Sequence, residues 1–110
     1  KYMKVLPFTA NTETGDQFEI EFPLHPETVD PIRVSQLASA ILQQMSNEFK
    51  ICGEMSNGDV LQALSMVLAI RARMIHAQED TIHNIASGLL ETALRAASDA
   101  DRNSVASGHA

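Results

Sequence analysis

The chain has 110 residues, a formal net charge of −6 and 45% hydrophobic residues, most of them aliphatic, with no tryptophan. This length predicts one domain with one modest core, and the aliphatic composition favours packed helices over a β-sandwich. The negative charge disfavours nucleic acid and anionic membranes as partners, and no apolar run is long enough to span a bilayer. A single cysteine excludes an intrachain disulfide, so we expect a cytoplasmic protein.

A β-hairpin is predicted at residues 3–23. Residues 18–22 alternate strictly between apolar and acidic side chains, which is the pattern of a half-buried strand, and a cluster of turn-forming residues precedes them. This alternation places Phe18, Ile20 and Phe22 on one face. Because an isolated two-stranded hairpin is only marginally stable, we expect helices or a second chain to cover that face.

Three helices are predicted to follow, over residues of about 31–51, 58–77 and 80–98. Asp30 and Pro31 are suited to the N-cap and first turn of the first helix. Its apolar residues, like those of the third helix, recur at helical spacing along one stripe. The second helix is apolar almost all round, which is typical of a buried helix, so we expect it to be the central and buried element of the core.

The sequence leaves open whether the second and third helices form one continuous rod. Leucine or isoleucine recurs every seven residues from Leu61 to Leu89, as a continuous helix would allow. A helix over residues 59–98 would be about 60 Å long and would need a partner chain to cover it. We therefore favour a break near residues 77–81, with Asp80 as the N-cap of the last helix.

These elements predict a helix-dominated α+β fold, with a hairpin followed by three helices in a single domain over residues 1–98. Residues 99–110 are small and polar, and we expect them to form a flexible C-terminal tail. The lone Cys52 is interpreted as a small apolar core residue. Residues 56–59 are interpreted as a helix cap, because they lack the lysine and the glycine spacing of a phosphate-binding loop.

One candidate metal site consists of His76, Asp80 and His83. On a continuous helix these residues would share one face, and two imidazoles with a carboxylate suit zinc or iron. This pattern supports one alternative function, a metal-binding sensor or a small metal-dependent enzyme. A solvated polar face between apolar stripes explains the same residues, and a helix break would separate them.

Arg71 is unusual because it falls on the apolar stripe between Leu68 and Ile75. A buried charge is costly unless it is paired, so the arginine is expected to extend toward a carboxylate of its own chain or of a second chain. Another alternative is a module that binds a small anionic ligand, anchored by Arg71 and its neighbour Arg73.

The leading functional hypothesis is a small acidic interaction or oligomerisation module that acts as a homodimer, in an accessory, adaptor or chaperone-like role. The second helix has more apolar surface than two neighbouring helices can cover, and twofold dimers are the commonest oligomers. No arrangement of catalytic residues is evident, so a non-enzymatic role is favoured. The predicted interface consists of Phe18, Ile20, Phe22, Leu61, Leu64, Leu68, Arg71, Ile75 and Ile82.

Overall fold

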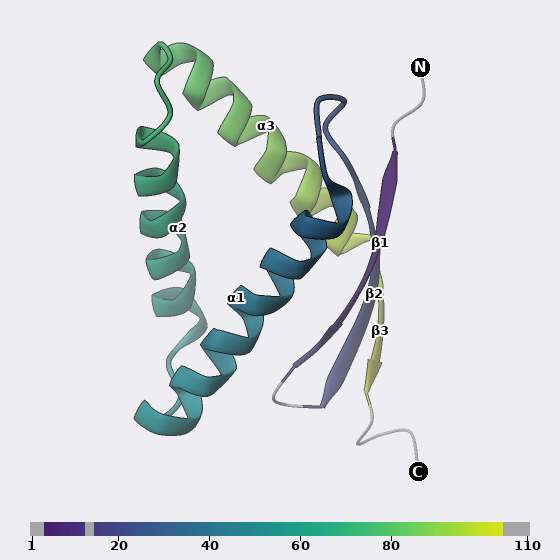
Figure 1. Ribbon diagram of the computed structural model, residues 1–110. Coiled ribbons are helices and arrows are strands. Elements are labelled where there is room, and N and C mark those ends of the chain that lie inside the picture. The colour runs from purple at the N-terminus through teal and green to yellow at the C-terminus, as the bar shows by residue number, and fades with distance from the viewer. Residues whose placement is uncertain (1–3, 13–14, 105–110) are drawn as a thin grey trace.

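The computed structural model describes residues 4–12 and 15–104. It contains an antiparallel hairpin, three helices and a short last strand (Figure 1). This arrangement confirms the predicted helix-dominated α+β fold. In chain order, the elements are β1 (Val5–Asn11), β2 (Asp16–Pro23), α1 (Pro31–Cys52), α2 (Asn57–Arg73), α3 (Glu79–Ser98) and β3 (Asp101–Ser104).

The hairpin has the register that its alternating pattern predicts. Phe8 lies opposite Ile20 and Leu6 lies opposite Phe22, so the apolar side chains share one face. Along β1 and β2 these apolar residues are half-buried, whereas residues such as Glu19 are exposed. The sheet order is β1-β2-β3.

The third strand was not predicted. Residues 101–104 fall in the segment expected to be a flexible tail, yet they pair antiparallel with residues 16–19 of β2. The four residues of β3 have no apolar alternation of their own. Their conformation depends on a strand that lies more than 80 residues earlier in the chain, which local sequence patterns do not reveal. Residues 105–110 of the predicted tail lie outside the described residues.

Helix α1 begins and ends as the local chemistry predicts. The Asp30 side chain accepts a hydrogen bond of 3.2 Å from the backbone N–H of Arg33, and Pro31 occupies the first turn. At the other end, Gly53 has a φ of 95° and its N–H donates to the carbonyl of Phe49. A positive φ suits glycine because it has no Cβ, so Gly53 ends the helix and turns the chain toward α2.

Helices α2 and α3 are separate, as the sequence favours, but the break comes earlier. Ser56 caps α2 by accepting a hydrogen bond of 3.2 Å from the N–H of Asp59. The helix ends at Arg73, and α3 begins at Glu79 with Gln78 at its N-cap. The break therefore covers residues 74–78 instead of 77–81. Asp80 lies in the first turn of α3 and is not its cap.

The three helices form an open triangular frame beside the sheet (Figure 1). Helix α1 contacts β1 and α3 contacts β2, whereas α2 lies on the side away from the sheet and contacts α3. Among the described residues, no Cα atom of α1 lies within 8 Å of α2 or of α3. Leu24, with 9% exposure, is the only buried hydrophobic residue in the part of the chain that the structure describes.

The prediction that α2 is central and buried is therefore wrong for a single chain. Nearly every residue of α2 is exposed. The apolar pattern of a helix indicates that it should be buried, but it does not say whether its own chain supplies the cover.

The molecule is expanded and thin for its mass. Its radius of gyration is 15.6 Å, whereas a compact chain of this length would have about 13 Å. The 12.0 kDa chain exposes 9004 Å², compared with about 6,000 Å² for a compact monomer of that mass. The surface surplus of roughly 3,000 Å² is the main structural feature that any function must explain.

Candidate interaction surface on the helices

The angle between α2 and α3 holds a small apolar groove. Its volume is about 390 Å³, and Arg71 is the only charged residue in its lining. Four of the residues that line it belong to the seven-residue repeat of the sequence: Leu68, Ile75, Ile82 and Leu89. Because the two helices diverge, these four side chains line an open groove. In a compact core they would pack against each other.

Arg71 lies in the last turn of α2, at this groove. Its Nη1 donates to the sulfur of Met74 at 2.9 Å. Among the side chains that the structure describes, the one ion pair joins Arg95 to Glu91, so Arg71 has no carboxylate partner there. The predicted pairing with a carboxylate of its own chain is therefore not formed.

Arg73 lines a second, more polar groove on another side of the same two helices. This groove has a volume of about 700 Å³ and also contains Glu79, Asp80 and His83. No group of three or more histidine, cysteine, aspartate or glutamate residues within the described ranges could hold a metal ion. The predicted set of metal ligands is not assembled, because the helix break leaves His76 outside both helices.

Cys52 is exposed at the end of α1, and its interpretation as a core residue is wrong. Its Sγ donates to Oε2 of Glu48 at 3.2 Å. This hydrogen bond raises the pKa of the Cys52 thiol, and the negative charge of the same carboxylate raises it further. The thiol is therefore held in its protonated form, which is the less nucleophilic one.

The hairpin residues of the predicted interface lie together on one face of the sheet. Phe18, Ile20 and Phe22 are half-buried on the face of the sheet that carries the apolar residues. Helix α3 contacts β2, so part of the sheet is covered by its own chain. The interface role of these three residues stays a prediction.

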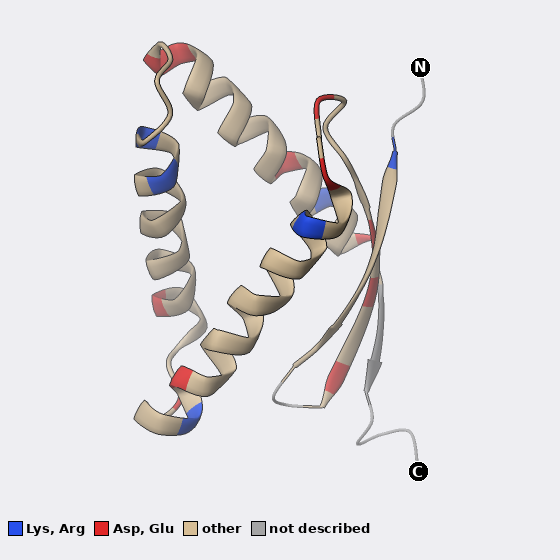
Figure 2. Ribbon diagram, viewed as in Figure 1, with Lys and Arg blue, Asp and Glu red and all other residues tan. Residues whose placement is uncertain are grey.

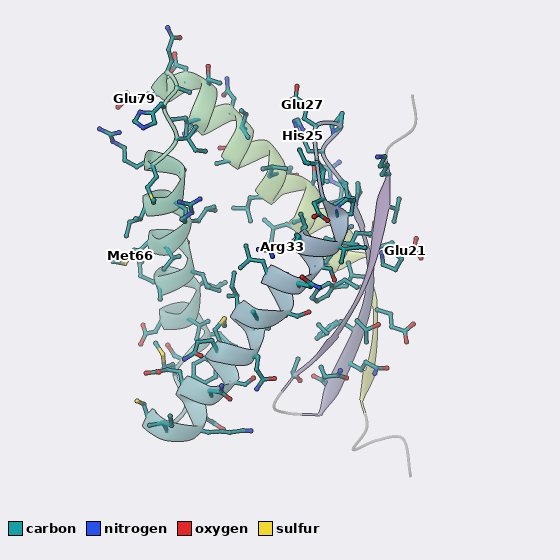
Figure 3. All side chains as sticks on the ribbon, viewed as in Figure 1. Glu21, His25, Glu27, Arg33, Met66 and Glu79 are labelled. Carbon is teal, nitrogen blue, oxygen red and sulfur yellow. The ribbon has the colours of Figure 1, made fainter. Side chains whose placement is uncertain are left out.

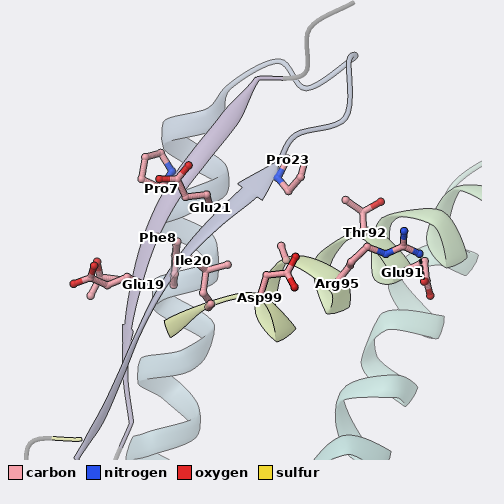
Figure 4. Close-up of a pocket in the computed structure, with 13 residues that line it drawn as sticks. Pro7, Phe8, Glu19, Ile20, Glu21, Pro23, Glu91, Thr92, Arg95 and Asp99 are labelled. Carbon is pink, nitrogen blue, oxygen red and sulfur yellow. Dashed lines mark hydrogen bonds and ion pairs between the residues drawn. The ribbon is translucent and has the colours of Figure 1, made fainter. Parts of the chain in front are cut away.

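A pocket of about 750 Å³ lies between β2 and the last turns of α3 (Figure 4). Its charged side chains are mostly acidic. Arg95 pairs with Glu91 at 2.7 Å, and this hydrogen bond raises the pKa of the Arg95 guanidinium further above its usual value. The pocket therefore offers no unpaired cation for an anionic ligand. The acidic residues in its lining are Glu19, Glu21, Glu91 and Asp99.

The exposed apolar surface extends over all three helices, beyond the residues that were predicted as an interface. Leu61 (64% exposed), Leu64, Leu68 and Ile75 of that prediction belong to it, and Ile82 is half-buried. Sequence periodicity already marked the additional residues as helix faces, but it assigned them to an intrachain core. On α1, on α2 and at the C-cap of α2 they include Val34, Leu37, Ile41, Leu42, Met66, Val67, Ile70 and Met74.

The class defined by these features is a helix-dominated α+β protein with an uncovered apolar helical surface. Comparison with models of known families, with curated proteins and with solved structures gave no match. None of the described helices combines the length and the apolar character needed to cross a membrane.

Proposed function

We propose that this protein is a self-associating interaction module whose helices complete their core against a second copy of the chain. The observation that carries the proposal is the surface surplus of roughly 3,000 Å² relative to a compact monomer of the same mass. Monomeric proteins rarely expose contiguous apolar patches larger than about 600 Å². Obligate dimers bury about 1,000–2,500 Å² on each chain, so an interface in the upper part of this range would account for most of the surplus.

The distribution of the apolar residues supports a second copy as the partner. All three helices carry uncovered apolar stripes, while the sheet already has cover from α1 and α3. A twofold dimer brings the same apolar patch of both chains together, so each copy covers the other. The dimer would then act as an accessory, adaptor or chaperone-like subunit for another protein.

Light scattering after size-exclusion chromatography tests this proposal at micromolar concentration. The parent is expected to have twice the chain mass of 12.0 kDa. Val67→Asp places a charge on the exposed apolar surface of α2 and is expected to shift the protein toward the monomer. Gln36→Asp, which adds the same charge on α1, should leave the dimer intact. A parent protein that remains monomeric would overturn the proposal.

A second candidate function is supported by the position of Arg71. An apolar groove of about 390 Å³ with a single cation in its lining suits a small apolar carboxylate. Such a ligand would stabilise the native state and raise its unfolding midpoint. A thermal-shift series with medium-chain fatty acids tests this function, with Arg71→Gln as the control that should abolish the shift.

A further inference from the structure

Helix α2 has a second apolar seam, distinct from the side that faces α3. The apolar α2 residues that line the grooves shared with α3 are Leu68, Ala69 and Ala72. The residues of the second seam line neither groove. They are Val60, Ala63, Val67 and Ile70 of the helix and Met74 at its C-cap.

The spacing of this seam is that of a helix-pairing surface. Its residues alternate between steps of three and four, which is the heptad pattern that brings side chains onto one line along a helix. Val67, Ile70 and Met74 are 57%, 62% and 59% exposed. No Cα atom of α1 approaches α2 within 8 Å in the described chain, so α1 does not cover the seam.

One edge of the seam has an acidic residue at one end and a basic residue at the other. Asp59, Met66 and Arg73 recur every seven residues, so they follow the same edge from the start of α2 to its end. Figure 2 shows the acidic residue and the basic residues of α2 at its opposite ends. Met66 points away from the opening of the frame in Figure 3.

The charges at the two ends of this edge have no partner within the described part of the chain. Asp59 and Arg73 are separated by about 21 Å along the helix, too far to pair with each other. Among the described side chains, neither the carboxylate of Asp59 nor the guanidinium of Arg73 forms an ion pair or a hydrogen bond. Pairing with a second chain would therefore not disrupt any existing ion pair.

We infer that two copies of this chain pair through α2 in antiparallel orientation, with the seam of each helix packed on the seam of the other. The inference rests on the proposed function and specifies its interface. A twofold axis perpendicular to the helices brings the same edge of both helices to the same side. Asp59 then meets Arg73 of the second copy, Arg73 meets its Asp59, and the two Met66 side chains meet near the axis.

A parallel pair does not have this charge complementarity. In a parallel pair the edge with Asp59 and Arg73 faces the opposite edge of the second helix, which carries Leu64 and Arg71. Arg73 would then lie near the second cation, Arg71. The antiparallel orientation also gives a thin molecule its missing second layer, since its extents are 51 × 36 × 22 Å.

Charge reversal tests the inference through sedimentation velocity over a dilution series. Asp59→Arg and Arg73→Asp each place like charges across the pair twice, and each is expected to weaken the dimer about tenfold. The double variant D59R/R73D restores opposite charges and is expected to return to within about threefold of the parent.

Intrachain effects predict the opposite result for the double variant. Both substitutions oppose the helix dipole, and Arg73→Asp also approaches Glu79 and Asp80 across the polar groove. These penalties add, so they would make dimerisation of the double variant weaker than that of either single variant. If the parent dimerises but the double variant dimerises more weakly than both single variants, the antiparallel pairing is overturned. The proposed function would still stand in that case. A monomeric parent would overturn both.

Disulfide trapping gives a second readout. In a Cys52→Ser background, Met66→Cys is expected to form a disulfide-linked dimer under mild oxidation. Ser65→Cys, on the side of α2 that lines the polar groove shared with α3, is the matched control and should remain reduced. Equal trapping of the two variants, or none at Met66→Cys in a dimeric protein, would contradict the antiparallel pairing.

Discussion

The rings of Phe8 in β1 and Phe22 in β2 meet edge to face, with centroids 6.1 Å apart and ring planes inclined by 68°. They join the two strands on the apolar face of the sheet. An aromatic pair of this geometry contributes about 0.5–1.5 kcal/mol beyond the area that it buries. The contact fixes the hairpin that anchors two of the three helices.

Phe22→Ala is therefore expected to destabilise the protein by about 2–3 kcal/mol, because it removes a half-buried ring and its aromatic partner. Urea unfolding followed by circular dichroism at one fixed protein concentration measures the change. Thr9→Ala, on the exposed face of β1, is the control and should change stability by less than about 0.5 kcal/mol. Similar losses in both variants would show that the apolar face is not the core of the hairpin.

Two glycines are expected to respond in opposite ways to alanine. Gly53 has a φ of 95°, which strains any other residue, so Gly53→Ala should cost about 1–2 kcal/mol. Gly88 lies inside α3 and faces open space where an alanine methyl group would sit, so Gly88→Ala should stabilise the helix by about 0.5–1 kcal/mol. Thermal unfolding midpoints of the two variants check this. A destabilising Gly88→Ala would show that another chain packs there.

The reactivity of Cys52 is expected to depend on Glu48. Glu48→Gln removes the carboxylate that raises the pKa of the thiol, so the thiolate fraction at pH 8 should increase. The rate of alkylation by iodoacetamide is the measurement, and it should be faster in the variant. Glu54→Gln is a matched control, since its carboxylate forms no hydrogen bond with Cys52. Equal rates in all three proteins would exclude the interaction in solution.

Unfolding is expected to depend on protein concentration, because a dimer that folds by completing a shared core gains stability by mass action. The thermal midpoint should rise over a hundredfold range of concentration. Leu37→Asp, on the exposed stripe of α1, should lower the midpoint and reduce its dependence on concentration. Gln36→Asp, at the neighbouring position, is the control and should leave the midpoint and its dependence on concentration unchanged. A midpoint that is constant over this range would contradict a shared core.

Zinc is expected to leave the protein unchanged, since His76, Asp80 and His83 do not form a cluster that could hold a metal ion. Thermal unfolding with and without zinc checks this, together with metal analysis of protein purified without a chelator or histidine tag. Stoichiometric zinc that is lost in His83→Ala would restore the metal site predicted from the sequence.

Much of the fold could be predicted because it depends on local chemistry. The alternation around Ile20, the cap at Asp30 and the cap at Ser56 each act within a few residues. The half-buried ring of Phe22 meets Phe8 of its own chain, and its predicted place in an interface stays a prediction. Periodicity shows which side of a strand or helix needs cover, but the chain that provides it depends on contacts between distant segments.

The sequence by itself determined the order of the hairpin and the three helices and the apolar faces of the helices, because hydrogen bonds within each element and side-chain periodicity are local. Only the tertiary structure decided that β3 pairs with β2, that residues 74–78 separate α2 from α3, and that α2 lies uncovered. These features depend on how distant segments meet. The energy of such contacts comes from pairs of residues that no local sequence window contains.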